Sequence, residues 1–203
     1  MLSSREQNPN GQGPSRADLA RAGFINTTRA QRLLADPALT PLLQAIPVGQ
    51  LLSDLSDSPD PDQAALALVR LCEASPRPEQ LAQDLKHTQL RHRLLALLGA
   101  SSALGDFLIA HPDSVACLDQ EFDAEKVAAT MTSRVKRALD AGSIPDAVHG
   151  LRLSYYQALC AIAAGDLTHP QPLQYMPQVG LQLSQLADAA VTDRKSTRLN
   201  SSH

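Results

Sequence analysis

Two aspartates separated by a proline, Asp60 and Asp62, have the spacing at which paired carboxylates hold a metal ion in nucleotidyl-transfer enzymes. In such enzymes the pair lies on a strand that follows a glycine- or serine-rich turn. No strand is expected before this pair, because residues 53–59 read SDLSDSP. We therefore predict a solvated loop whose acids favour the positive N-terminal end of a helix over residues 63–74.

A short basic run, Arg91, His92 and Arg93, is a second arrangement that could contact an anion such as phosphate. A phosphate site of this kind normally includes a glycine-rich loop, and none accompanies the run. We therefore expect the three side chains to lie on a solvated helix face. His111 stands directly before Pro112, and we expect a turn residue there rather than a metal ligand.

The three cysteines, Cys72, Cys117 and Cys160, are widely spaced and form no C-x-x-C pair. We expect reduced thiols that act as small core hydrophobes in a cytoplasmic protein. The sequence contains no G-x-x-x-x-G-K-[ST], G-x-S-x-G or H-E-x-x-H motif and no Cys/His set with zinc spacing. It therefore predicts no catalytic, cofactor-binding or metal-ligating residue in this chain.

The elements that position these residues are predicted to be helices throughout. Of the 203 residues, 43% are hydrophobic but only 3% are aromatic, so leucine and alanine supply most of the apolar surface, as in helix packing. The net charge of −3 and the lack of a basic block indicate no nucleic-acid partner. No apolar run approaches the roughly 18 residues of a membrane helix, so no membrane partner is expected. We predict an all-α, bundle-like chain of about nine to eleven helices without a sheet.

Residues 97–112 are predicted to form a helix, a tight corner and a second helix. Gly99 is expected at the C-cap of the first helix, where a residue tolerant of the left-handed conformation is needed. Ser101 or Ser102 is expected to cap the second helix, which Pro112 ends. Gly105 inside that helix indicates close approach of another helix.

Capping residues and apolar periodicity place the other helices. Ser15 and Asp18 predict a capping box at the start of the first helix. Thr27 or Thr28 is predicted to cap the second helix. Longer helices are expected over residues 63–74, 79–87, 89–98, 123–141, 146–166 and 173–190. The inward-facing residues of the last helix are expected to be Met176, Leu183, Leu186 and Ala190. The basic residues of the helix over 123–141, Arg134 among them, are expected to be solvated.

The stretch LGASSALGDFLIAHP, residues 98–112, resembles the signature L-G-A-S-x-x-L-G-D-x-L-x-x-H-P in the N-terminal part of glutamine synthetase adenylyltransferases. Residues 16–24 (RADLARAGF) and 30–37 (AQRLLADP) resemble opening helices of the actinobacterial branch, and residues 151–167 and 183–190 resemble later helices of the family. The resemblance covers about residues 15–192. It departs from the family pattern at Ala161 and Gly165, where arginines are usual.

The resemblance implies an enzyme that attaches AMP from ATP to a tyrosine of glutamine synthetase and removes it with phosphate. It implies an α/β nucleotidyltransferase domain that binds Mg²⁺ and ATP, with glutamine synthetase and a nitrogen-signal protein as partners. That domain would follow residues 15–192, so we expect this chain to be a helical fragment that lacks the catalytic residues and is inactive by itself.

A free-standing α-helical interaction module is the alternative. A fragment should leave one apolar face uncovered on the helices over residues 145–190, whereas a self-contained module should not.

Residues 1–14 are polar and are predicted to be disordered. Residues 193–203, DRKSTRLNSSH, match one reading frame of a common sequencing-adapter DNA, so we expect them not to belong to the natural protein.

Overall fold

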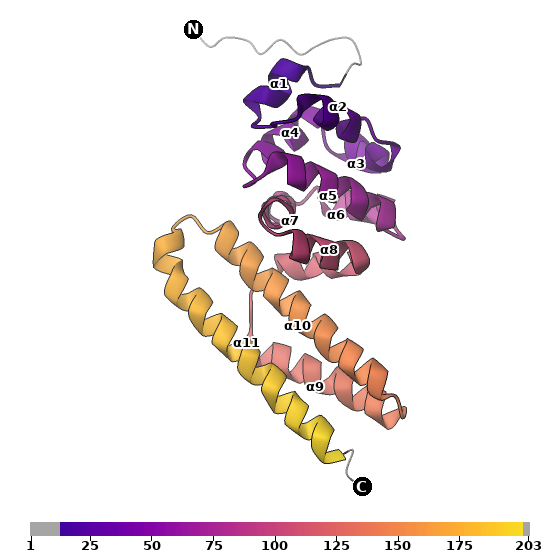
Figure 1. The fold of residues 1–203 in the computed structure, drawn as a ribbon, viewed down its shortest axis with the longest axis vertical. Helices are drawn as coiled ribbons and strands as arrows, with labels where there is room; N and C mark the ends of the chain where they lie inside the picture. Colours follow the sequence, from indigo (N-terminus) through magenta and orange to yellow (C-terminus); the bar gives the residue numbers. More distant parts are fainter. Residues whose placement is uncertain (1–12, 201–203) are drawn as a thin grey trace.

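The computed structural model describes the backbone of residues 13–200 and the side chains of residues 13–191. The predicted disordered tail, residues 1–14, lies outside this range except for Gly13 and Pro14. The described chain consists of eleven α-helices and two 3₁₀ helices and contains no strand, which confirms the all-α class. Figure 1 shows two regions, with α1–α8 stacked in layers at one end and α9, α10 and α11 forming an elongated bundle at the other.

The first layers are short helices. They are α1 (Arg16–Arg21), α2 (Thr27–Leu34), the 3₁₀ helix η1 (Pro37–Leu39), α3 (Thr40–Ala45) and α4 (Val48–Ser56). Ser15 and Asp18 form the predicted capping box at the start of α1. The cap of α2 is Asn26 rather than Thr27 or Thr28, because the Asn26 carboxamide accepts a hydrogen bond from the backbone N–H of Arg29.

The next layers contain the stretch that resembles the adenylyltransferase signature. They are α5 (Pro61–Ala74), α6 (Pro78–Asp84), α7 (Thr88–Ala100), α8 (Ser102–Ala110) and the 3₁₀ helix η2 (Pro112–Asp119). The helix predicted over residues 79–87 ends earlier, at Asp84, since the chain turns there and His87 becomes the N-cap of α7.

The predicted role of Gly99 as a C-cap is wrong. The helix continues through Gly99 to Ala100, and Ser101 ends it by taking an extended conformation in which its hydroxyl caps α8. Gly99 instead permits close contact, because a Cβ atom there would lie 3.1 Å from both the backbone N and O of Asp60. Gly105 is buried where α8 packs on α5, as its predicted role in a close helix contact requires.

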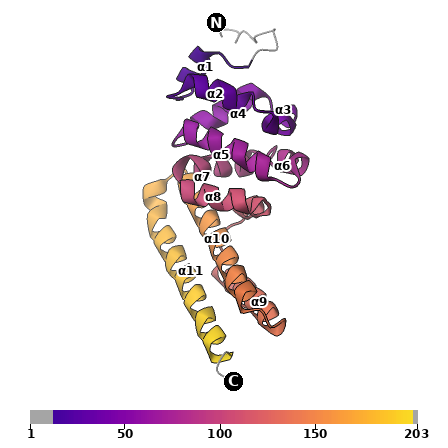
Figure 2. The same cartoon turned by 45° about the vertical axis from the view of Figure 1, so that its right-hand side comes forward.

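The elongated region consists of three helices, α9 (Ala124–Asp140), α10 (Ile144–Leu167) and α11 (Pro172–Asn200). Asp123 caps α9 as predicted, and Gly142 with a φ of 76° ends the turn that follows it. α10 is shared between the two regions, since it packs against α9 and α11 and also against α7 and η2. Figure 2 shows its C-terminal end beside α7.

α11 differs from its prediction in length and in orientation. It continues past residue 190 to Asn200, so its backbone includes part of residues 193–203, whose side chains lie outside the described range. Met176 and Leu183 were expected to face inward but are 61% and 42% exposed. The buried positions are Gln182 and Leu186, and the partly buried Val179 and Ala189 pack beside them. These four residues lie at helical spacing on the side of α11 that meets α9 and α10, so Met176 and Leu183 fall on another side.

Candidate functional site

The Asp60–Pro61–Asp62 pair is used to cap and connect helices. The Asp60 carboxylate accepts a hydrogen bond from the backbone N–H of Gln63 at 2.9 Å, which confirms its predicted role at the start of α5. The Asp62 carboxylate accepts from the backbone N–H groups of Ile25 and Asn26 at 2.7 and 3.3 Å. Asp62 therefore holds the α1–α2 connection against α5, while Asp60 caps α5 itself. No group of three or more His, Cys, Asp or Glu residues placed to hold a metal ion occurs among the residues that the structure describes.

The basic run at residues 91–93 is not a solvated face, and that prediction is wrong for Arg91. Its side chain is 5% exposed, and its Nε–H group donates to Asp54 Oδ2 at 2.5 Å. Its terminal nitrogen Nη1 donates to the carbonyl oxygen of Leu85 at 2.8 Å. Asp54 is itself 3% exposed, so α4 and α7 are joined by a buried ion pair.

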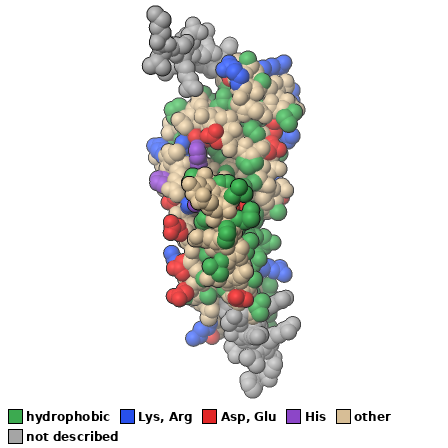
Figure 3. All heavy atoms as spheres, turned by 90° about the vertical axis from the view of Figure 1, so that its left-hand side faces the viewer, with side chains coloured by type: hydrophobic (Ala, Val, Ile, Leu, Met, Phe, Trp, Pro, Cys, Tyr) green, Lys and Arg blue, Asp and Glu red, His purple; other side chains and the backbone are tan. Residues whose placement is uncertain are grey.

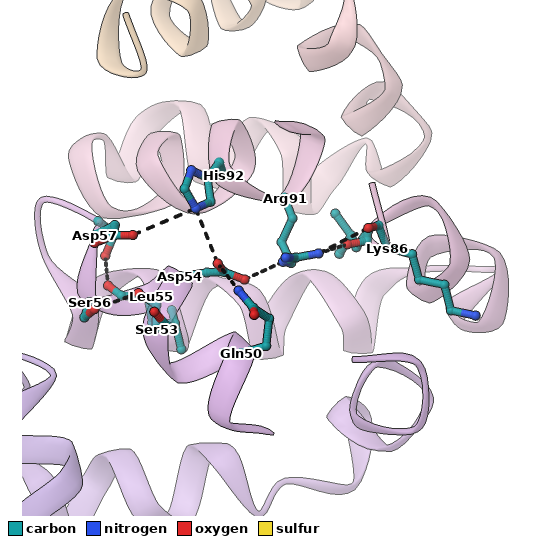
Figure 4. Close-up of polar contacts among 11 residues, drawn as sticks. Gln50, Ser53, Asp54, Leu55, Ser56, Asp57, Lys86, Arg91 and His92 are labelled. Atoms are coloured by element: carbon teal, nitrogen blue, oxygen red, sulfur yellow. Dashed lines mark hydrogen bonds and ion pairs between the residues drawn. The ribbon is translucent and has the colours of Figure 1, made fainter. Parts of the chain in front are cut away.

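The carboxylate of Asp54 is the centre of this network, as Figure 4 shows. Gln50 Nε2 donates to its Oδ1 atom at 2.9 Å, and His92 Nε2 lies 3.3 Å from the same atom. Removing one partner of a buried, hydrogen-bonded ion pair typically costs about 3–5 kcal/mol, because the other charge is left without compensation. We therefore assign this network to positioning α7 rather than to chemistry.

Sequence inspection missed Asp54, although a signal was present. Asp54 lies between Leu51 and Leu55 on the buried face of α4, at helical spacing. A carboxylate on an apolar helix face requires a charged or hydrogen-bonding partner elsewhere in the chain. Only the fold identifies that partner as Arg91, 37 residues away.

His111 occupies the turn between α8 and η2, as predicted. Its ring centroid lies 5.1 Å from that of Phe107 and 5.8 Å from that of His149 of α10. Phe107 also stacks on Tyr156, with ring centroids 5.2 Å apart. This aromatic cluster joins α8 to α10, which is a packing role.

The three cysteines are free thiols, as expected. Burial raises the pKa of Cys72, Cys117 and Cys160 to about 12 in each case, with Glu73 adding to the effect at Cys72. Because the thiolate is the reactive form, these groups are poor nucleophiles near neutral pH. The pKa values agree with their prediction as core residues.

Arg134 of α9 is also bonded rather than solvated, contrary to prediction. Its Nη1 atom donates to Ser154 Oγ at 2.8 Å and to Gln157 Oε1 at 2.9 Å. Gln157 in turn donates to Ser114 Oγ at 3.0 Å. This polar chain links α9, α10 and η2 beside a cavity of about 290 Å³.

An apolar stripe on α11 faces outward. Leu173, Met176, Leu183 and Val191 are 81%, 61%, 42% and 55% exposed. They recur at helical spacing on a side different from the buried seam of Gln182 and Leu186, and we call them the α11 outer face. Figure 3 shows hydrophobic side chains gathered on the side of the molecule where α11 runs. An uncovered apolar face on these helices is what the fragment hypothesis predicted.

None of the helices among the described residues is both long and apolar enough to span a bilayer.

Comparison with known proteins gives relatives in sequence only. No protein-family model matches the chain, and no solved structure matches it. The bifunctional glutamine synthetase adenylyltransferase/adenylyl-removing enzyme of Mycobacterium avium is 36% identical over 199 residues, which cover 90% of this chain and 19% of that enzyme. The enzymes of the same name from Streptomyces avermitilis and Leifsonia xyli are 36% and 31% identical, each over 85% of this chain and 17% of the relative.

The fold and its surfaces define an all-α segment with a buried charge network and an uncovered apolar helix face. The chain is a homologue of one segment of the glutamine synthetase adenylyltransferases, which confirms the resemblance found in the sequence. It spans about one fifth of the length of the curated relatives it matches.

Proposed function

We propose that residues 15–192 form a helical segment of a bifunctional glutamine synthetase adenylyltransferase/adenylyl-removing enzyme. The observation that carries this proposal is the extent of the similarity, which includes 90% of this chain but 19% of the Mycobacterium avium relative. The segment would act as a scaffold, with the α11 outer face packed against other parts of the enzyme. AMP transfer would take place outside these helices.

Three aspartates support the proposal that AMP transfer takes place outside these helices. Mg²⁺ and ATP, which the resemblance implies, require free carboxylates beside a nucleotide site. Asp60 and Asp62 accept backbone hydrogen bonds, and Asp54 is paired with Arg91, so these three do not fit a magnesium site. For the whole enzyme we propose glutamine synthetase as protein substrate, a nitrogen-signal protein as regulator and the cytoplasm as location.

An AMP-transfer assay tests the first part of the proposal. The 203-residue chain is incubated with glutamine synthetase, Mg²⁺ and ATP labelled on the α-phosphate, beside the Mycobacterium avium enzyme as positive control. We expect no label on glutamine synthetase above background from this chain. Label transfer by the chain alone would contradict the proposal that the chemistry takes place outside these helices.

A chimera tests the scaffold role. In the Mycobacterium avium enzyme, the aligned segment is replaced by residues 15–192 of this chain, and AMP transfer is measured. We expect an active chimera, and we expect the double substitution Met176→Asp and Leu183→Asp on the α11 outer face to remove most of that activity. A matched chimera with Gln174→Asp and Gln185→Asp, at exposed polar positions of the same helix, should remain active.

The free-standing interaction module predicts the opposite result. In that case the chimera would be inactive whichever residues of α11 were changed. The isolated chain would be monomeric and would unfold in one cooperative transition, because nothing would be missing from its surface.

A further inference from the structure

The α11 outer face has a regular spacing that suits a second helix. Exposed positions along it alternate in steps of three and four residues, namely Leu173, Met176, Gly180, Leu183 and Ala187. Residues at this spacing form one stripe along an α-helix, and such stripes are the surfaces by which two helices pack side by side. The seam of α11 against α9 and α10 lies on another side, at Gln182 and Leu186, so no helix of the described residues covers this stripe.

Gly180, in the middle of this stripe, is not required by the packing of the described chain. A Cβ atom added there would meet nothing within 4 Å, and its φ is not among the positive values of the described glycines. Glycine is also among the least favourable residues in a helix interior. Gly105 shows what such a residue permits, because α8 packs closely on α5 at that point. Gly180 is therefore a second observation that points to a helix packed against this face.

The charges of α11 indicate the chemistry of the partner. Between Pro172 and Val191 the helix contains a single charged residue, Asp188, which lines a recess against α9 and does not lie in the stripe. Helix faces that contact water normally carry charged residues, whereas the centres of protein interfaces are depleted of them. The α11 outer face thus has the composition of an interface centre, and it suits a partner helix with uncharged, mainly apolar side chains.

The length of the relatives indicates where this partner helix comes from. The matched segment is 19% of the Mycobacterium avium enzyme, so about four fifths of that enzyme lies outside it. A helix of the same polypeptide docks without the loss of translational freedom that a separate molecule pays. A segment of the same enzyme is therefore favoured over a second copy or a separate protein.

We propose that an uncharged, mainly apolar α-helix from the part of the enzyme outside residues 15–192 packs lengthwise along the α11 outer face, with its backbone closest to α11 at Gly180. Steps of three and four residues correspond to a crossing angle of about 20°. At that angle the contact extends from Leu173 to Val191, a length of about 27 Å. The inference rests on the proposed function, because it takes this chain to be a segment of the larger enzyme. It adds the kind of element that covers α11, its alignment and the point of closest approach.

Photo-cross-linking in the Mycobacterium avium chimera tests the shape of the partner. The photoreactive residue p-benzoylphenylalanine replaces Met176 in one sample and Leu183 in another, and mass spectrometry locates the residues that become cross-linked. The two positions are about 10.5 Å apart along α11. We expect cross-links within one chain to residues about seven positions apart, as along a helix, whereas a strand would give about three. The control is Leu181, which is 58% exposed on another side of α11 and should give no cross-link to that segment.

Gly180→Leu tests the close approach by opposite effects in two proteins. In the 203-residue chain the leucine meets no neighbour and favours the helix, so amide hydrogen exchange of α11 should slow about three- to fivefold. In the chimera the same side chain obstructs the partner helix, and exchange of α11 should become about tenfold faster. Changes of the same sign in the two proteins would overturn the proposal.

The remaining outcomes separate this inference from the proposed function. Cross-links between two copies of the chimera, cross-links spaced as on a strand, or equal cross-linking from Leu181 and Leu183 would each overturn the partner helix. AMP transfer by the chimera is measured in parallel. An active chimera without the expected cross-links removes the partner helix and leaves the scaffold role standing, whereas an inactive chimera removes both.

Discussion

The layered region α1–α8 and the bundle α9–α11 are both helical, but they bury very different numbers of apolar side chains. Thirty buried hydrophobic residues form one continuous core in the layered region, and this core includes Cys160 and Ala164 of α10. The bundle has a second core of four, namely Met131, Ala158, Ile162 and Leu186. Since burial of apolar surface is the main source of stability, the layered region is held by its own packing.

The bundle is held together in a different way. Its α11 seam contributes a buried glutamine and one fully buried leucine, while other apolar side chains of the same helix, Leu173, Met176 and Leu183, face outward. Its firmest attachment is α10, which docks into the core of the layered region. The layered region and the docked end of α10 therefore contain most of the buried apolar surface, whereas α9 and α11 are held by a much smaller core.

The largest expected effect concerns the buried ion pair in the layered region. Arg91→Met leaves Asp54 buried without its cation, and we expect a loss of about 3–5 kcal/mol in the free energy of unfolding, measured with urea. The matched control is Arg70→Met, which breaks the exposed pair with Asp106 and should cost less than about 1 kcal/mol. Equal losses in the two variants would show that the α4–α7 network does not hold the layers.

The rates at which Cys72 and Cys160 react with a thiol reagent would show whether the layered region and α10 open at different rates. Burial raises the pKa of Cys72 from 9.0 to about 12, so at pH 8 its native thiolate fraction is about a thousandfold lower than that of an unperturbed thiol. We expect a disulfide reagent to react with Cys72 only on global unfolding, and with Cys160 sooner, when α10 separates from the layers. Mass spectrometry of the labelled positions measures both rates.

The same pKa shifts predict a pH dependence of stability. A thiol with a raised native pKa keeps its proton longer in the folded state, so its stabilising effect is complete below the unfolded pKa of 9.0 and is lost as pH rises toward about 12. Cys160→Ala should therefore lose less stability than wild type between pH 9 and 11, by urea unfolding at each pH. An unchanged pH profile in this variant would contradict burial of the thiol in the native state.

Alanine substitutions at two glycines, one in each region, test how closely the two regions are packed. At Gly99 of α7 an added Cβ would lie 3.1 Å from backbone atoms of Asp60, so Gly99→Ala should destabilise the protein by about 1–3 kcal/mol. At Gly180 of α11 nothing lies within 4 Å, and Gly180→Ala should stabilise α11 by about 0.5–1 kcal/mol through helix propensity. Thermal unfolding of both variants gives the sign of each change, and opposite signs are expected.

The smallest expected effect on stability is at the α11 outer face. Met176→Glu with Leu183→Glu should change the free energy of unfolding of the isolated chain by less than about 0.5 kcal/mol, because both side chains are exposed. The double variant should also bind less of a hydrophobic dye than wild type. Leu186→Glu, in the buried seam of the same helix, should release α11, which hydrogen exchange would detect. Similar exchange in the two variants would contradict the assignment of inner and outer faces.

Local signals in the sequence predicted helix starts with good accuracy. Ser15 with Asp18, Asp60 and Asp123 each cap a helix as expected, since a cap is a hydrogen bond between residues three apart. The homologous family was also recognisable from short motifs. Prediction failed at Gly99, where the glycine is required by the backbone of a distant segment rather than by its own turn.

The sequence by itself determined the all-α class and most helix boundaries, because these depend on residue type and on neighbours within one helical turn. Only the tertiary structure decided that Asp54 pairs with Arg91 and that α11 buries Gln182 and exposes Leu183. The physical reason is that partners far apart in the chain are selected by how whole helices pack. A helix with apolar residues on two sides carries no local signal for which side turns inward.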